Sequence, residues 1–342
     1  MVDLVVVHYH LLLGGVTSVI HDGLRAIIQH QPGLLRSIHL IVGRRDGVNS
    51  ILVSLRTAAA ESKAETAIRA TIDQRLDYAT TDIKPTDWKF PVTIGPDTIW
   101  WFHNHHLGKN LSFTRALLAK SVSGPSRVLL QIHDFPECGR LKDYQAIRST
   151  IGNNLYPFGP NLRYVVINRR DYEALSAAGI PDSCLHLLWN PVMPIEREKV
   201  SEQMIATLIP NANRLWLYPV RARRRKNILE AGLLARMIDG AAVAVTLPAF
   251  SEPELAYYRQ AEALFRDGTL PGLLGLGAKP RFRGHSLAQF AGAADAVIST
   301  SIEEGFGYQY LHARSWQIPL IAREIDSIDG FHDIIRGPST VL

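Results

Sequence analysis

The chain has 342 residues, of which 46% are hydrophobic and 20% are charged. This composition excludes a wholly disordered protein, and the length exceeds what one hydrophobic core usually carries, so we expect two domains. Two cysteines, Cys138 and Cys184, form no disulfide framework, and no apolar stretch is long enough to cross a bilayer. A net charge of +5 is compatible with anionic partners, meaning phosphates, nucleotides or an acidic membrane surface, and equally with a mildly basic soluble protein.

The first half of the chain alternates between apolar strands and helical segments. Residues 2–8 are an apolar, β-rich run that we interpret as a first strand and not a signal peptide. A Gly14-Gly15 turn and a helix over 16–31 follow. Further strands are expected at 38–42, 98–102, 128–132 and 164–167, and helices at 54–77, 111–121 and 170–178. This alternation predicts a mainly parallel sheet covered on both faces.

The pattern restarts after a proline-bearing segment at 190–194. The strands expected there are 215–219, 241–247, 279–283, 294–299 and 319–322, with helices over 226–238 and from about Tyr308. We therefore predict an N-terminal domain over 1–194 and a C-terminal domain over 195–342.

The most informative segment is the loop between the strand at 294–299 and the helix from Tyr308. It reads Ser-Ile-Glu-Glu-Gly-Phe-Gly over 301–307, with two carboxylates and two glycines. Loops at the carboxyl ends of parallel strands are where open α/β sheets bind ligands. Glycines allow close approach of the backbone, and the N–H groups at the start of a helix favour an anion.

This segment resembles the nucleotide-sugar loop of retaining glycosyltransferases with the GT-B fold, of the family 4 type. The family pattern is Ser-x-x-Glu-Gly-Phe-Gly followed by a helix that carries a second Glu-Ala pair, and His312 stands where that second glutamate would be. The resemblance implies an α/β protein of two Rossmann-like, doubly wound domains facing a central cleft. The N-terminal domain would hold the acceptor, and the C-terminal domain the nucleotide sugar. Chains with this fold usually continue further past the strand at 319–322, so the resemblance implies either a truncated chain or an abbreviated second domain.

The run 218–227 follows a predicted strand and resembles the phosphate clamp of this family. Arg221 and Lys226 fall on the clamp positions, and a guanidinium fork with an ammonium group would cover both phosphates. The alternative is a solvated basic turn, which the matching glutamate loop downstream disfavours. Residues 223–225 are expected to face solvent or acidic lipid.

Glu304 resembles the family glutamate that approaches the transferred sugar, where it would stabilise developing positive charge. The alternative is an acidic residue favoured by the dipole at a helix start. The histidine at position 312 offers one acceptor nitrogen in place of two carboxylate oxygens. Either the ribose is held differently, the donor is atypical or its binding is weaker, and a core or surface histidine is the alternative. The other residues expected at the donor are Gly15, Gly284, His285, Gly305, Phe306 and Gly307.

On the N-terminal side, His133 resembles the family histidine that hydrogen-bonds the donor sugar, with Asp134 orienting its ring. A His-Asp pair that only caps a loop is the alternative. The residues expected to line the cleft on the acceptor side are His103, Asn104, His106 and Lys109, with Lys109 facing an anionic acceptor. A buried polar cluster is the alternative for these, since no acidic or cysteine ligand lies at a metal spacing.

The resemblance therefore predicts a metal-independent, retaining hexosyltransferase of carbohydrate biosynthesis. It would use a nucleotide-diphosphate sugar as co-substrate, no cofactor, and a carbohydrate, lipid or small-molecule acceptor. Transfer would occur on one face of the sugar, with the departing phosphate taking the acceptor proton. We expect a cytoplasmic protein that binds no nucleic acid, with contact to an acidic inner membrane face as an option. The alternative function is a GT-B-like nucleotide or sugar-phosphate-binding protein with little or no transferase activity.

Overall fold

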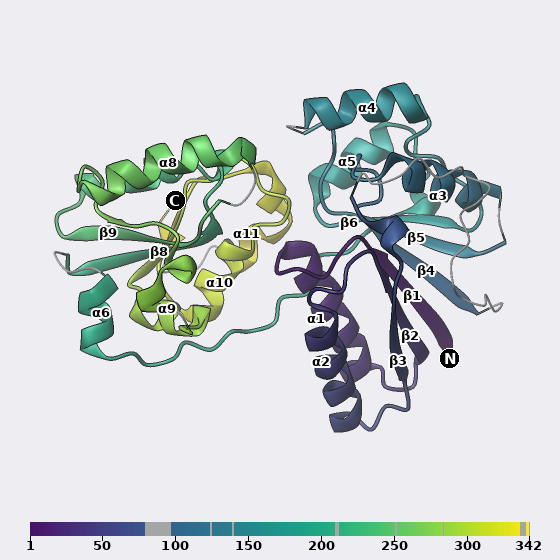
Figure 1. Ribbon diagram of the computed structural model, residues 1–342, viewed down its shortest axis with the longest axis horizontal. Helices are drawn as coiled ribbons and strands as arrows, with labels where there is room; N and C mark the ends of the chain where they lie inside the picture. The colour runs from purple at the N-terminus through teal and green to yellow at the C-terminus, as the bar shows by residue number, and fades with distance from the viewer. Residues whose placement is uncertain are drawn as a thin grey trace. The chain divides into compact units, whose positions relative to one another are not determined.

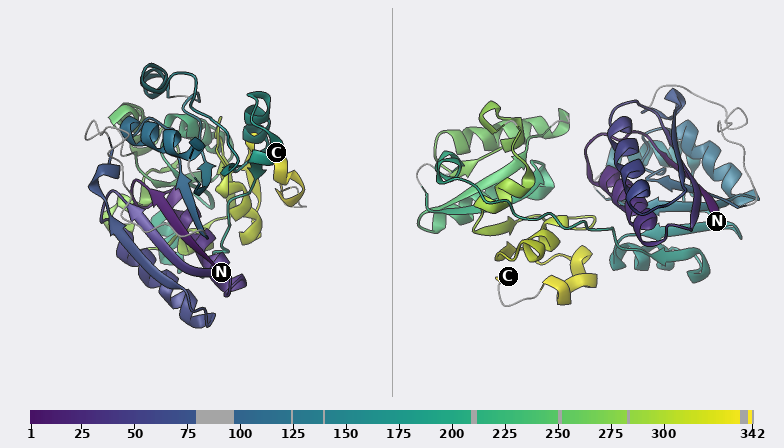
Figure 2. Two further views of the ribbon diagram at one scale, coloured as in Figure 1. Left: turned by 90° about the vertical axis from the view of Figure 1, so that its right-hand side faces the viewer. Right: turned by 90° about the horizontal axis from the view of Figure 1, so that it is seen from below.

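The computed structural model describes residues 1–78, 97–123, 125–138, 140–208, 212–249, 252–282, 284–335 and 340–341. The chain divides into two compact units, Met1–Pro191 and Val192–Leu342 (Figures 1 and 2). The division falls within the proline-bearing segment, close to the boundary expected after Pro194. Within the described ranges, no helix combines the length and apolar character that crossing a bilayer requires.

The first unit is built on a seven-stranded parallel sheet with the order β3-β2-β1-β4-β5-β6-β7 (Figure 1). Its strands are β1 Val2–His8, β2 Leu35–Val42, β3 Ala67–Ile72, β4 Thr98–His103, β5 Arg127–Ile132, β6 Leu162–Val166 and β7 Leu185–Leu187. Its helices are α1 Gly15–His30, α2 Val48–Glu61, α3 Leu111–Ser123, α4 Leu141–Ile151 and α5 Arg169–Ala177. The expected doubly wound architecture is confirmed.

The uninterrupted apolar sequence of β1 has a structural reason, because both faces of this sheet are buried. Leu4 and Val6 belong to the core formed with α1 and α2. Val5 and Val7 belong to the core formed with α3, α4 and α5 on the other face. Alternate residues of one strand thus enter two cores, which is typical of parallel sheets with helices on both sides.

The second unit contains a six-stranded parallel sheet with the order β10-β9-β8-β11-β12-β13. Its strands are β8 Arg214–Arg221, β9 Ala241–Leu247, β10 Gly272–Leu273, β11 Ala296–Ser299, β12 Leu320–Ala322 and β13 Thr340–Val341. Its helices are α6 Glu202–Leu208, α7 Ile228–Met237, α8 Glu252–Arg266, α9 Leu287–Ala293, α10 Tyr308–Trp316 and α11 His332–Ile335. Its core lies between the central strands β8, β9 and β11 and helices α7 and α8.

Two expected elements differ from the structure. The helix expected over 54–77 ends at Glu61, and the edge strand β3 follows it. Only one side chain of β3 is buried, so its sequence lacks the apolar run of an inner strand. The strand expected at 279–283 is instead a short 3₁₀ helix, Pro280–Phe282, and residue 283 lies outside the described ranges. Pro280 cannot donate a backbone hydrogen bond to a sheet, which disfavours a strand there.

Candidate functional site

The parallel pairing of β8 with β11 brings two of the predicted segments together. Trp216 lies opposite Ala296 in this ladder, so both strands end at the same edge of the sheet. The basic turn (222–227) follows β8, and the acidic loop (300–307) follows β11. The backbone N–H of Ile302 donates to the carbonyl of Arg225 at 3.0 Å, and the Thr300 hydroxyl donates to the carbonyl of Asn227 at 2.9 Å. The two segments therefore form one continuous surface at the carboxyl edge of the sheet.

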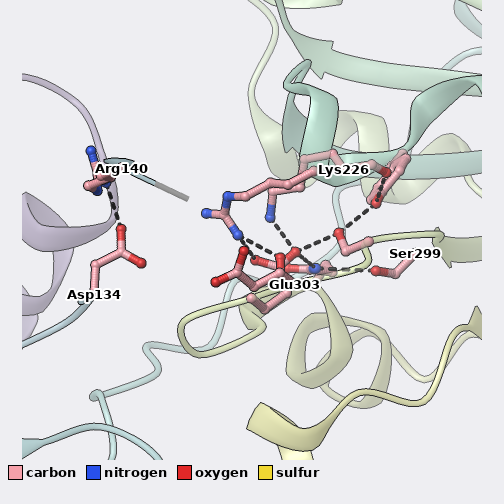
Figure 3. Close-up of polar contacts among 10 residues, drawn as sticks. Asp134, Arg140, Lys226, Ser299 and Glu303 are labelled. Atoms are coloured by element: carbon pink, nitrogen blue, oxygen red, sulfur yellow. Dashed lines mark hydrogen bonds and ion pairs between the residues drawn. The ribbon is translucent and has the colours of Figure 1, made fainter. Parts of the chain in front are cut away.

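Glu304 is the centre of this junction and is 5% exposed. Its Oε1 accepts hydrogen bonds from Lys226 Nζ, from Ser301 Oγ at 2.6 Å and from Gln309 Nε2 at 2.5 Å (Figure 3). Its Oε2 accepts from Arg225 Nη1 at 3.3 Å. Because cations from the basic turn hold this carboxylate, it is not simply an acid at the start of a helix. The junction couples a fixed negative group to cations that can meet a phosphate.

The two charges of the Lys226–Glu304 pair respond differently to burial. Loss of hydration lowers the pKa of the Lys226 ammonium to about 8, although the attraction of Glu304 opposes that shift. Burial raises the pKa of Glu304, but the charges of Lys226 and Arg225 and several hydrogen bonds outweigh it and hold the pKa below its usual value. More hydrogen-bond donors contact Glu304 than acceptors contact Lys226. The surroundings therefore offset the cost of burying the charged carboxylate but not that of burying the ammonium group. Near pH 7 both groups are charged.

The glycine at the end of the acidic loop allows the turn into α10. Gly307 has φ of +86°, a conformation that side chains rarely adopt. A Cβ atom there would lie 3.0 Å from Tyr310 Cδ2 and 3.1 Å from Ile328 Cγ2. Phe306 is 5% exposed and contacts the Tyr308 ring edge-on at 5.1 Å between centroids. Phe306 thus anchors the loop by packing, while the half-buried Gly305 lies beside Glu304 in the sequence.

In the first unit, the strand ends carry a cluster of histidines (His8, His103 and His133). His103 Nδ1 lies 2.9 Å from His133 Nε2, and the two rings stack with 13° between their planes. His8 donates through Nδ1 to the carbonyl of His103 at 3.2 Å, and the backbone N–H of His133 donates to Asn104 Oδ1 at 2.9 Å. All four residues are buried. His103 and Asn104, expected to line the acceptor side, thus hold His133 in place.

Burial sets the protonation state of this cluster. It lowers the pKa of His8 and of His133 to about 3 and that of His103 far below its usual value, and the neighbouring histidines reinforce each shift. These imidazoles are therefore neutral near pH 7, and His133 can take part in hydrogen bonds there without carrying charge. Within the described part of the chain, no group of three or more His, Cys, Asp or Glu side chains is arranged to hold a metal ion.

Comparison with known proteins places this geometry in a fold. No family model matches the chain. The structure of Alr3699/HepE from Anabaena, in complex with UDP and glucose, superposes with a TM-score of 0.62 and 13% identity over 97% of this chain and 83% of that one. Sucrose-phosphate synthase from Thermosynechococcus elongatus gives a TM-score of 0.57 and 12% identity over 96% and 83% of the two chains. These likenesses confirm the GT-B fold expected from the sequence.

A curated relative decides the family. Mannosylglucosyl-3-phosphoglycerate synthase from Petrotoga mobilis is 30% identical over 348 aligned positions, which cover 98% of this chain and 67% of the relative. The chain belongs to the same glycosyltransferase family as this synthase.

The structure corrects the sequence interpretation of the basic turn in this glycosyltransferase. The sequence predicts that Arg225 faces solvent or acidic lipid, but its Nη1 donates to the carbonyl of Glu303 at 2.6 Å as well as to Glu304 (Figure 3). Arg221 ends β8 and is half-buried, and burial lowers its pKa. The run of arginines in the sequence indicates that a cation is near the acidic loop. It does not show which arginine side chain contacts that loop.

The role expected for Asp134 is also wrong. Its carboxylate accepts from Arg140 at 2.8 Å (Figure 3), while its backbone carbonyl accepts from His106 Nε2 at 2.8 Å. His103, and not Asp134, contacts the His133 ring. The adjacent positions of His133 and Asp134 in the sequence suggested a pair, but successive side chains leave the chain in different directions.

His312 does not reproduce the glutamate that it replaces. Its ring stacks on Trp316 at 5.0 Å and on Tyr308 at 6.2 Å between centroids, within one face of α10. Burial lowers its pKa to about 4, so the ring is neutral near pH 7, and its buried Nδ1 has no hydrogen-bond partner among the described residues. His312 therefore offers an aromatic face and one neutral polar atom where the family pattern has two anionic oxygens.

The remaining predicted residues lie outside the hydrogen-bonded junction. Lys109 Nζ donates to Asp143 at 2.9 Å, so its charge is already neutralised by a partner. Gly15 is exposed at the start of α1, with open space where a Cβ would stand. Gly284 is exposed with φ of +88°, and His285 is half-buried against Phe290 at 6.2 Å between ring centroids. The sequence did not identify Ser301 and Gln309, which complete the shell around Glu304.

Proposed function

We propose that the chain transfers a hexosyl group from a nucleotide-diphosphate sugar to an acceptor hydroxyl, with retention of anomeric configuration. The observation that carries this proposal is the junction of Lys226, Arg225 and Glu304 at the carboxyl edge of β8 and β11. It sets cations beside the N–H groups of a glycine loop, which is a suitable arrangement for a diphosphate. The first unit would hold the acceptor, as the resemblance implies.

The names of the relatives agree with this chemistry. The Petrotoga relative is named for the synthesis of a mannosylglucosyl derivative of 3-phosphoglycerate, and the Anabaena structure holds UDP and glucose. We therefore propose a nucleotide sugar as donor and a hexose as the transferred group. The alternative of a binding protein without transferase activity is not favoured, because the relative is named as a synthase.

In the proposed reaction, the acceptor oxygen bonds to the anomeric carbon as the bond from that carbon to the β-phosphate oxygen breaks. The acceptor proton passes to the departing phosphate, so nucleoside diphosphate and glycoside are the two products. Lys226 and Arg221 would neutralise the charge that grows on the leaving group. Glu304 Oε1 already accepts three hydrogen bonds, whereas the contact of Oε2 within the described ranges is the long one to Arg225. Oε2 is the oxygen that we assign to the sugar.

The test is release of nucleoside diphosphate from a panel of nucleotide sugars, measured with the parent and three variants. We expect Glu304→Gln and Lys226→Ala each to lower turnover by about 100-fold or more, as loss of a charge that stabilises a transition state does. Glu303→Gln is the matched control, because Glu303 enters the junction through its backbone carbonyl. Circular dichroism checks that each variant is folded. Equal release by the parent and all three variants would contradict the proposal.

Retention and metal independence have their own readouts. The anomeric proton coupling of the product gives its configuration by NMR, and inversion would contradict that part of the proposal. Turnover should persist in excess EDTA, since the proposed reaction relies on cations of the chain. A cytoplasmic location and contact with an acidic membrane remain predictions, and sedimentation with anionic lipid vesicles tests the second.

A further inference from the structure

The first unit contains a cavity of about 720 Å³ that the proposed donor site does not use. It lies between the loop after β2 and the loop after β3, at the carboxyl ends of both strands. The residues that line it are Gly43, Arg44, Arg45, Asp46, Ile72, Gln74, Arg75 and Asp77. Ligands of doubly wound sheets bind outside this edge, so the position alone makes the cavity a candidate site.

The backbone beneath the cavity is tightly closed. The N–H of Gly43 donates to the carbonyl of Tyr9 at 2.8 Å, which ties the loop after β2 to the end of β1. A Cβ atom at Gly43 would lie 2.7 Å from the backbone nitrogen of Asp77 and 2.8 Å from the Tyr9 oxygen. Glycine is therefore required for the loops after β2 and β3 to meet. The side chains that follow Gly43 therefore extend from a backbone that these contacts hold in place.

Two of the three arginines in the cavity wall are held by carboxylates. Arg44 Nε donates to Asp77 Oδ1 at 2.7 Å, and Arg75 makes two hydrogen bonds, of 2.8 and 2.6 Å, to Asp73. The Arg44 guanidinium also lies over the Tyr78 ring, 5.5 Å from its centroid, and its two terminal nitrogens have no hydrogen-bond partner among the described residues. Arg45 is exposed and forms no ion pair within the described ranges. Adjacent guanidinium groups with unused donors therefore border the cavity.

We propose that this cavity binds the anionic group, a phosphate or a carboxylate, of the sugar acceptor. The proposal rests on the proposed function, since it assigns the acceptor class to the same glycosyltransferase. A guanidinium group donates two parallel hydrogen bonds to either anion, and Arg44 and Arg45 follow one another on the same loop. The Asp46 and Gln74 side chains can accept from hydroxyl groups of the same ligand.

The probe is 3-phosphoglycerate, which carries both a phosphate and a carboxylate, titrated calorimetrically into the full chain. Inorganic phosphate and glycerate separate the two anions, and glycerol is the uncharged probe. We expect Arg44→Gln and Arg45→Gln each to weaken binding of 3-phosphoglycerate by about 10-fold or more, the usual loss for a hydrogen bond to a charged group. The matched control is Arg36→Gln, which removes an exposed ion pair with Asp3 near the amino ends of β1 and β2.

The proposal is overturned if the parent binds none of the anions, or if the variants at positions 44 and 45 bind them as the control does. Arg45 is exposed and forms no ion pair with any described residue, so its variant should fold like the parent, and thermal melting checks this. Nucleoside diphosphate binding and release are measured in parallel. If the parent neither binds nor releases nucleoside diphosphate, but its anion binding still depends on Arg45, the proposed function and the acceptor role are contradicted. The anion site itself would still be supported.

Discussion

Lys226 is the residue at which burial and charge oppose each other most directly. It is 8% exposed, it pairs with Glu304, and burial lowers its pKa to about 8. A diphosphate favours the charged form, so above pH 8 the free protein must take up a proton before it binds. We expect nucleoside diphosphate affinity to be nearly flat around pH 7, to weaken through pH 8 and then to fall by up to about 10-fold per pH unit, as measured by calorimetry.

The same titration with Lys226→Arg identifies the group responsible. Arginine stays charged throughout this range, so the fall in affinity above pH 8 should disappear even if the affinity at pH 7 is lower. A parallel fall in parent and variant would assign the titration to another group. The variant also tests whether position 226 needs a compact ammonium or only a positive charge.

At the scale of elements, the site forms because β8 and β11 are adjacent strands of one sheet. Their parallel pairing places the basic turn and the acidic loop side by side, although 78 positions separate Lys226 from Glu304 in the sequence. The sequence predicts both strands and both segments, since buried strands read as apolar runs and the loop has a recognisable pattern. It does not predict β3, because an edge strand with one buried side chain lacks that signal.

Individual side-chain directions were less accessible from the sequence than the elements that carry them. Asp134 follows His133 directly but bonds Arg140, whereas His103 reaches His133 from the neighbouring strand β4. Arg225 lies within a run of similar residues, and only the geometry of the turn aims it at Glu304. Contacts of this kind depend on the register of strands and on turn geometry, which local composition does not encode.

The turn from the acidic loop into α10 should be sensitive to one methyl group. Gly307→Ala adds a Cβ at φ of +86° and at 3.0 Å from Tyr310. We expect a loss of unfolding free energy of about 2 kcal/mol or more and weaker nucleoside diphosphate binding, because the loop must shift. The control is Gly268→Ala, with φ of +80° but open space around the added atom. Equal losses in urea titrations would show that backbone strain alone matters.

At the scale of the whole molecule, the two units differ in the number and the burial of their histidines. Unit 1 contains ten of the thirteen histidines, which leaves three in unit 2. Among the described residues, the histidines that are buried and have lowered pKa values are His8, His39, His103, His105, His106 and His133, all in unit 1. Each unit has its own sheet and core, so the units can lose their structure separately.

This asymmetry predicts that acid unfolds unit 1 first. Each of these histidines stays neutral in the native state but has a pKa near 6.5 in the unfolded state. Its contribution to the free energy of unfolding is therefore complete above pH 6.5. The contribution falls by about 1.4 kcal/mol per pH unit per histidine as the pH drops from 6.5 towards the native pKa values near 3 to 4. Hydrogen exchange read by mass spectrometry should show β4 and β5 losing protection at a higher pH than β8, β9 and β11.

His105→Leu provides the matched variant for this prediction. His105 is 0% exposed, burial lowers its pKa well below the usual value, and neither ring nitrogen has a hydrogen-bond partner in the part of the chain that the structure describes. With leucine at this position, unit 1 takes up one proton fewer when it unfolds in acid, and the core loses two polar atoms that lack hydrogen bonds. The pH at which unit 1 is half unfolded should therefore be lower. The midpoint of unit 2 should stay where it is. Simultaneous loss of protection in both units, or an unchanged midpoint in the variant, would show that buried histidines do not control acid stability.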